Sequence, residues 1–335
     1  MESNNFLVFV RCSTYNHAAF IEDAMNGFCM QETTFPFVCC IIDDASTDGE
    51  PEIIRKYLND YFDLEDESMA LNKETDDFVL TFAQHKKNRN CYFAVFYLKY
   101  NHYSIKKSKV PYYKEWMDYT KYIAVCEGDD YWTVSHKLQK QYDFLESHTD
   151  FTCVFHRYKI KNELTKEFSL APNKYFDDPS HRDKVFFEFN NEYNLLVQWT
   201  TKTLTMMFRQ ELYNVDYLQK FRDSRDVHLA YYLLSQGKGA CMAFVGGVYN
   251  KNPRSIFGSK NRLERININK DVYKEFANKE HDFLLLETYN IFNDKYKLST
   301  LNSCSLFFFK IKRRARLFLT KNKRKKLYGR ILPNV

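Results

Sequence analysis

The chain has 335 residues, of which 44% are hydrophobic and 17% aromatic, so it can bury a substantial core and is not a disordered protein. With only 9 glycines and 7 prolines, it does not resemble a turn-rich all-β protein. The formal net charge of +6 arises in residues 310–330, which hold eleven lysines or arginines and no acid and leave 38 basic against 43 acidic residues elsewhere. Such a charge distribution excludes a uniformly basic nucleic-acid-binding protein.

The nine cysteines are odd in number, form no Cys-x-x-Cys pair and lie in several cases within apolar runs. This usage predicts reduced, buried thiols in a reducing compartment. The first residues lack the pattern of a signal peptide, and no uncharged apolar stretch reaches the length of about 18 residues that a membrane-spanning helix needs. We therefore expect a cytoplasmic protein without a transmembrane helix.

The predicted elements begin with a strand and a helix. Residues 6–12 and 37–42 are apolar runs that predict two buried strands. Between them, Asn16 or His17 would cap a helix whose apolar face consists of Phe20, Ile21, Ala24, Met25 and Phe28. Alternating strands and helices predict a parallel, doubly wound sheet whose ligands bind at the carboxyl ends of the strands.

The remaining pattern continues this alternation. Strands are predicted at 78–83, 91–98, 121–126, 151–156, 203–208 and 240–249, and helices at 137–145, 226–236 and over most of 262–319. Residues 101–113 are polar and basic, which predicts a loop, and residues 160–195 show no clear periodicity. We expect one α/β domain over residues 1–260, followed by a helical extension over 261–335.

Two acidic clusters follow apolar runs. They are Asp43, Asp44 and Asp48 after the second predicted strand, and Glu127, Asp129 and Asp130 after the strand at 121–126. Paired carboxylates at a strand end are costly without a cation or hydrogen-bond donors, and hard cations prefer carboxylate oxygen. The clusters together predict a site for a divalent metal and a phosphorylated ligand, whereas Asp48-Gly49 alone is more typical of a solvated turn.

The order of these features resembles the family 2 glycosyltransferases with the GT-A nucleotide-sugar-binding fold. The matching motifs are Thr14-Tyr15-Asn16, Asp43-Asp44-x-Ser46-x-Asp48-Gly49 and Glu127-Gly128-Asp129-Asp130-Tyr131-Trp132. The following stretch KLQKQYDFLE is similar to bacterial enzymes of capsule or lipopolysaccharide assembly. The resemblance covers about residues 5–260 and implies an α/β fold with a mostly parallel central sheet flanked by helices.

The resemblance also implies roles for single residues. The nucleotide would be bound by Thr14, Tyr15, Asn16, Asp44, Glu127 and Gly128. Among these, Asp44 would accept a hydrogen bond from the base, commonly uracil, and Glu127 would lie near the ribose. Asp129 would bind a Mn²⁺ or Mg²⁺ ion, which neutralises the charge that builds on a departing nucleoside diphosphate.

An inverting transfer also needs a general base for the acceptor hydroxyl. The family places an acid at the start of a helix after the metal motif, and Asp226 matches that position, with Asp223 as the rival. A helix N-cap is the structural alternative for Asp226. Residues that would border the sugar or acceptor pocket are Asp130, Tyr131, Trp132 and Trp199. For Tyr131 and Trp132, a place in the aromatic-rich core is the alternative interpretation.

The sequence departs from the family pattern in two places. Tyr249-Asn250-Lys251-Asn252 stands where relatives often carry Tyr-Arg-x-His, so a histidine near the metal or diphosphate is missing there, and Lys251 or Arg254 would have to act electrostatically. Ile105-Lys106 stands where relatives have Gly-Lys. These departures keep open a degenerate, non-catalytic domain that acts as a membrane-attached assembly factor.

In the basic tail, aromatic and aliphatic residues interleave with lysine and arginine over residues 306–330. This pattern predicts a helix that lies on an anionic membrane surface at the inner face of the membrane, with a solvated helix and nucleic-acid binding as alternatives. We predict an inverting, metal-dependent glycosyltransferase with a nucleotide-sugar donor, a glycan or lipid-linked acceptor and no nucleic-acid partner. A sugar nucleotidyltransferase would need a glycine-rich loop after the first strand, which this chain lacks.

Overall fold

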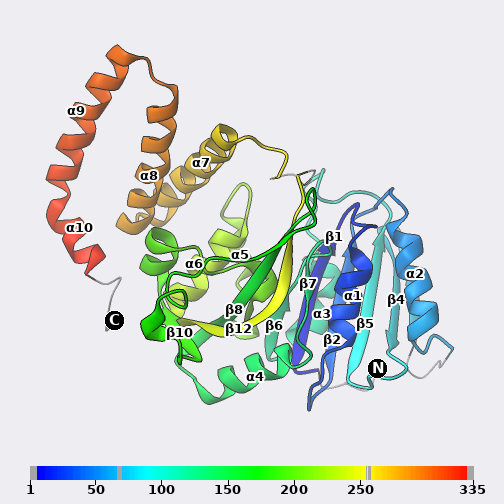
Figure 1. Ribbon diagram of the computed structural model, residues 1–335. Coiled ribbons are helices and arrows are strands. Elements are labelled where there is room, and N and C mark those ends of the chain that lie inside the picture. Colours follow the sequence, from blue (N-terminus) through cyan, green and yellow to red (C-terminus); the bar gives the residue numbers. More distant parts are fainter. Residues whose placement is uncertain (1–5, 66–69, 254, 256–257, 330–335) are drawn as a thin grey trace. The chain divides into compact units, whose positions relative to one another are not determined.

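A computed structural model describes residues 6–65, 70–253, 255 and 258–329, which form two compact units (Figure 1). The first unit consists of Met1–Glu188, Thr201–Asn214 and Gln236–Asn250, and the second of Phe189–Thr200, Val215–Ser235 and Lys251–Val335. The two units interleave along the chain, and the predicted division at residue 260 stays a prediction.

The strands form one mixed sheet with the order β10-β12-β8-β11-β6-β1-β2-β5-β4-β3, while β7 pairs with β12 and β9 with β8. Their bounds are β1 Val8–Thr14, β2 Phe37–Asp43, β3 Leu71–Glu74, β4 Phe78–Gln84, β5 Cys91–Leu98, β6 Tyr122–Val125, β7 Tyr131–Trp132, β8 Phe151–Asn162, β9 Phe168–Leu170, β10 Phe186–Phe189, β11 Met207–Arg209 and β12 Lys238–Lys251.

The centre of the sheet is parallel. Strand β1 pairs in parallel with β2 and β6, and β2 pairs in parallel with β5. The outer strand β4 pairs antiparallel with β5, and β11 pairs antiparallel with β6. The predicted parallel sheet therefore describes the four central strands β6, β1, β2 and β5. In the β1–β2 register Thr14 lies opposite Asp43, which brings the carboxyl ends of the two strands to the same edge.

Helices cover both faces of this central sheet (Figure 1). The first unit contains α1 Ile21–Cys29, α2 Glu50–Tyr61, α3 Val110–Asp118 and α4 Lys137–Ser147, with short helices η1 Pro179–His181, η3 Thr203–Thr205 and η4 Gln210–Leu212. Side chains of a strand alternate between faces. Val8 and Val10 therefore share a core with Phe28 of α1, whereas Phe9 stacks on Tyr113 of α3 with ring centroids 5.5 Å apart.

Two local predictions are corrected by the structure. Helix α1 has Phe20 as its N-cap, without a side-chain hydrogen bond, so neither Asn16 nor His17 caps it. Helix α3 begins within the predicted loop at 101–113. Only Tyr113 and Met117 of α3 are buried, and two buried positions give too weak a periodicity to be recognised in the sequence.

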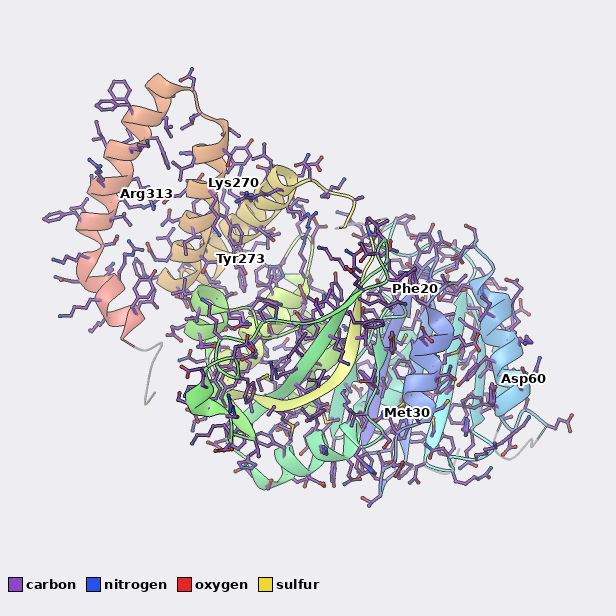
Figure 2. All side chains as sticks on the ribbon, in the orientation of Figure 1. Phe20, Met30, Asp60, Lys270, Tyr273 and Arg313 are labelled. Atoms are coloured by element: carbon purple, nitrogen blue, oxygen red, sulfur yellow. The ribbon has the colours of Figure 1, made fainter. Side chains whose placement is uncertain are left out.

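The second unit is helical and has its own aromatic core. It contains η2 Tyr193–Val197, α5 Val215–Gln219, α6 Asp226–Gln236, α7 Arg262–Glu280, α8 Phe283–Thr300, α9 Ser303–Leu319 and α10 Lys321–Tyr328. The helices predicted at 226–236 and across 262–319 are therefore confirmed. Phe276 packs at 5.0 Å from the rings of Phe221 and Tyr231, and Tyr273 of α7 joins them (Figure 2). No helix within the described residues is long and apolar enough to span a bilayer.

Candidate active site

Backbone hydrogen bonds tie the ends of three strands together. The Asp44 N–H donates to the Thr14 carbonyl at 3.0 Å, and the Gly128 N–H donates to the Ser13 carbonyl at 3.1 Å. The Ser13 N–H in turn donates to Glu127 Oε2 at 3.1 Å. Because all three strands run parallel, both acidic clusters follow strand ends at one edge of the sheet, on either side of β1.

A buried carboxylate fixes the loop after β1. Glu50, the first residue of α2, accepts hydrogen bonds from the Thr14 hydroxyl, from Ser46 Oγ at 2.9 Å and from the His17 N–H at 2.8 Å. A Cβ at Gly128 would lie 2.2 Å from Thr14 Oγ1, so a larger residue would displace this threonine. Thr14 is buried and holds the loop through these contacts, and glycine is required beside it.

The outer part of the same loop is open to solvent. The ring of Tyr15 is exposed. Asn16 has a left-handed backbone with φ of 56°, and its Oδ1 accepts from the Thr47 N–H at 2.8 Å. Asp48 Oδ2 accepts from the Ala18 N–H at 2.9 Å, so this carboxylate links two loops and is more than a solvated turn.

Asp44 is held by three donors. Its carboxylate is 2% exposed and accepts from the His102 N–H at 2.7 Å, the Tyr103 N–H at 3.1 Å and Lys109 Nζ at 2.7 Å. An ionised carboxylate has about four lone-pair sites, so about one is left for a ligand donor. Lys109 was missed in the sequence because no local pattern pairs it with a residue 65 positions away.

Asp43 lies beside this anion but in a different environment. Its side chain is buried and accepts from the Ser46 N–H at 3.1 Å. Burial raises the pKa of Asp43 to about 6, against the opposing effect of the Ser46 hydrogen bonds, and the negative charges of Glu50 and Asp44 raise it further.

In the second cluster Glu127 and Asp129 are partly exposed, whereas Asp130 is buried. Burial raises the pKa of Glu127, while the positive charge of Arg11 opposes the rise. Asp130 accepts from the Asn250 N–H at 2.9 Å, and burial, reinforced by the charge of Asp129, raises the pKa of Asp130 well above its ordinary value. The side chain of Asp129 is 19% exposed and can reach a ligand.

A histidine lies beside Asp129. His17 Nε2 is 3.9 Å from Asp129 Oδ2, and His17 Nδ1 is 3.1 Å from Thr14 Oγ1. In the described ranges no group of three His, Cys, Asp or Glu side chains forms a ready-made metal site. Magnesium is often bound by one or two carboxylates together with substrate phosphates, and imidazole suits several divalent metals. Asp129 and His17 therefore offer ligand atoms of a kind that fits a Mn²⁺ or Mg²⁺ ion.

The altered segment 249–255 contacts the same cluster. Asn250 Nδ2 donates to the Asp129 carbonyl at 2.6 Å. Lys202 Nζ lies 3.4 Å from the centroid of the Tyr249 ring, and its positive charge lowers the pKa of Asp130 against the larger effect of burial. The predicted electrostatic substitute Arg254 lies outside the described residues. The histidine near Asp129 is His17, which belongs to the loop after β1 and not to segment 249–255.

The predicted pocket aromatics occupy different environments. Trp132 is 1% exposed, its Nε1 donates to the Leu204 carbonyl at 2.8 Å, and its ring packs on Phe28 with centroids 5.0 Å apart. Trp132 is therefore a core residue, as in the alternative interpretation of its position, and its side chain is too buried to lie against a sugar. Tyr131 is partly exposed and remains a candidate. Trp199 packs against the core of the second unit.

The two candidate bases also belong to the second unit. Asp226 is the first residue of α6, is exposed, and its Oδ1 accepts from the Val227 N–H at 3.0 Å. Asp223 is exposed and lies 3.9 Å from Arg222 Nε. The position of Asp226 at a helix start agrees with the sequence pattern, and its role as base stays a prediction.

Comparison with known proteins shows a family resemblance over part of the chain and a shared fold. Residues 11–68 match the family Glycosyl transferase family 2. Uncharacterized proteins of Mycobacterium tuberculosis and Mycobacterium bovis are 30% identical over 152 residues, which are 44% of this chain and 34% of theirs. The chain thus spans about a third of the length of these relatives.

Among solved structures, residues 1–349 of TarS from S. aureus in complex with UDP-GlcNAc share 15% sequence identity with this chain, with a TM-score of 0.52 over 88% of this chain and 73% of that chain. The TarS complex with UDP gives a TM-score of 0.50 at the same identity, over 87% and 72%. This likeness shows a common GT-A fold. Residues 11–68 are thus similar to the family 2 glycosyltransferases, and the motifs at the ends of β1, β2 and β6 belong to a fold that the chain shares with TarS.

Proposed function

We propose that the protein is an inverting, metal-dependent glycosyltransferase. It would move a sugar from a nucleotide-sugar donor, of the UDP type, to a hydroxyl of a glycan or lipid-linked acceptor during synthesis of a surface polysaccharide. The observation that carries the proposal is that Asp44 and Asp129 follow strand ends at one edge of the parallel sheet. The TarS structures of the same fold contain UDP and UDP-GlcNAc, which supports a nucleotide-sugar donor.

Donor binding would use the residues around the ends of β1 and β2. Asp44, already held by Lys109 and two backbone N–H groups, would accept one further hydrogen bond from the base. The exposed ring of Tyr15 offers a face for stacking. Glu127 would accept from a ribose hydroxyl, because its Oε2 is held at the sheet edge by the Ser13 N–H.

Asp129 and His17 would hold the metal ion. When bound, such an ion neutralises negative charge on a departing diphosphate. The chain itself limits charge repulsion at this edge, because Asn250 and Lys202 lie against Asp130 and Arg11 lies near Glu127.

In the transfer, Asp226 would accept the proton of the acceptor hydroxyl. The acceptor oxygen then forms a bond to the anomeric carbon on the side opposite the donor diphosphate. The bond from that carbon to the diphosphate oxygen breaks, and its electron pair leaves with the nucleoside diphosphate. The configuration at the anomeric carbon is inverted.

For the base, we expect Asp226→Asn to lower kcat by about 10²- to 10⁴-fold with little change in donor KM, because the amide cannot take the proton. The neighbouring Asp223→Asn tests the rival candidate in parallel, since both side chains are exposed acids three positions apart, and it should keep nearly the wild-type kcat. Steady-state rates of nucleoside diphosphate release with acceptor present measure the difference. Equal activity of both variants and the wild type would remove Asp226 from the mechanism.

The donor assignment is tested by calorimetry with UDP, GDP and ADP, with and without Mn²⁺, followed by a hydrolysis screen across nucleotide sugars. We expect one nucleoside diphosphate to bind at least ~10-fold more tightly when Mn²⁺ is present. Absence of binding by all three, with a folded protein, would favour a non-catalytic domain.

Residues 306–330 would attach the protein to the inner, anionic face of a membrane, where a lipid-linked acceptor is found. Their exclusively basic charge supports this part of the proposal.

A further inference from the structure

Helix α9 packs against α8 through its charged side. Arg313 Nε lies 2.8 Å from Asp294 Oδ2, and Arg316 Nη2 lies 2.7 Å from the same oxygen (Arg313 is labelled in Figure 2). In α10, Arg324 Nε lies 2.9 Å from Glu287 Oε2. The carboxylates of Asp294 and Glu287 are largely buried, so these arginines serve the packing within the second unit.

The apolar side of α9 faces solvent instead. Five large apolar side chains are between 48% and 81% exposed, namely Phe307, Phe308, Ile311, Phe318 and Leu319. At about 100° per residue they span an arc of about 120°, and Ala315 lies within it. The inward side carries Phe309, which is 9% exposed and contacts Lys297. The helix is thus oriented opposite to an ordinary surface helix, whose apolar stripe faces the core.

The charge around this arc favours contact with an anionic bilayer over contact with a second copy of the chain. Residues 303–329 contain ten lysines or arginines and no acid. With three arginines paired internally, exposed cations such as Lys310, Lys312 and Arg314 flank the apolar arc. A second copy of the chain would bring the same positive charge against this surface, whereas an anionic bilayer offers both opposite charge and an apolar interior.

We propose that the outer arc of α9 inserts into the boundary between headgroups and acyl chains of an anionic bilayer. This inference specifies which side chains make the membrane attachment named in the proposed function. It rests on the proposed function only for the identity of the acceptor. The aromatic and aliphatic side chains of the arc enter the boundary, and Lys310, Lys312 and Arg314 contact lipid phosphates. Arg313, Arg316 and Arg324 stay on α8 and contribute little to lipid binding.

The test is co-sedimentation of the full chain with phosphatidylcholine vesicles with and without phosphatidylglycerol. We expect binding only to the anionic vesicles, and a loss of roughly 30-fold or more in partitioning for the double variant Phe307→Ser/Phe318→Ser, because two large apolar side chains no longer leave water. Leu164→Ser, which removes a 76% exposed leucine from the β8–β9 turn, is the matched control and should bind like the wild type.

Two further variants separate lipid contacts from packing. Lys312→Gln/Arg314→Gln should weaken binding to anionic vesicles and reduce its salt dependence. Arg316→Gln should lower the melting temperature but leave vesicle binding by the folded fraction within about twofold of the wild type. A Trp at position 307 (Phe307→Trp) should shift its emission to the blue and be quenched by brominated lipid, and a Leu164→Trp variant should not.

The inference is overturned if Phe307→Ser/Phe318→Ser binds anionic vesicles as the wild type does. It is equally overturned if the wild type self-associates without lipid and that variant does not, because a second copy would then cover the arc. Donor hydrolysis in solution is measured in parallel on the same proteins. If the wild type hydrolyses donor but does not bind anionic vesicles, the membrane inference alone fails. If the wild type binds vesicles but does not hydrolyse any donor, the proposed enzymatic function fails and the membrane inference stands.

Discussion

Replacing Asp129 with asparagine is expected to lower kcat for sugar transfer by about 10³-fold. The substitution keeps the shape of the side chain but removes the negative charge that, with His17, fits a divalent cation. Because Asp129 is partly exposed and lies in the turn between β6 and β7, the fold should tolerate the change. The measurement is nucleoside diphosphate release as a function of Mn²⁺ concentration.

The matched control for this variant is Asp60→Asn, which removes a carboxylate from the exposed end of α2 (Figure 2). It should leave both the rate and the Mn²⁺ dependence unchanged. Thermal melting of both variants checks that they are folded. Turnover by Asp129→Asn at the wild-type rate and with the same metal dependence would refute the metal assignment.

Replacing Lys137 with methionine is expected to stabilise the protein by about 3 kcal/mol at pH 7. Lys137 is fully buried, and its Nζ has no hydrogen-bond partner. The Nζ lies 3.8 Å from the centroid of the Trp132 ring, which compensates only part of the lost hydration. Burial lowers the pKa of Lys137 from 10.5 to about 7.

The pH dependence follows from that shift. Between about pH 7 and pH 10.5 the unfolded chain holds the lysine proton and the native chain releases it, so this group makes stability rise with pH across that window. Below pH 7 both states are protonated and the cost of the buried charge is fully present. The advantage of Lys137→Met should therefore be fully present below pH 7 and shrink from pH 7 toward pH 10.

Urea denaturation at pH 7, 8.5 and 10 measures both effects. Lys140→Met on the same helix is the control, because Lys140 is exposed and surface substitutions usually change stability by less than about 0.5 kcal/mol. A destabilised Lys137→Met protein, or a stability difference that does not change with pH, would contradict the conclusion that Lys137 is buried at a cost and has a lowered pKa.

The sequence by itself determined the elements whose pattern is local. Strands β1, β2 and β5 are nearly continuous apolar runs, and α1 has one apolar face, so their existence follows from side-chain periodicity alone. The acidic motifs at the ends of β2 and β6 gave the resemblance to a family, because residue types and their spacing can be read from the sequence. The resemblance implied a mostly parallel sheet, but the position of β1 between these two strands comes from the structure.

Tertiary structure alone decided which side chains meet. His17 meets Asp129, and Lys109 meets Asp44, across loops that no local pattern connects. Trp132 and Lys137 became core residues because α1 and α4 close over them, although one was expected at a pocket. Arg313 and Arg316 of α9 face inward, where they pair with the buried Asp294 of α8, and the aromatic arc lies outside. Pairing energy depends on burial and distance, and neither is encoded within a short stretch of sequence.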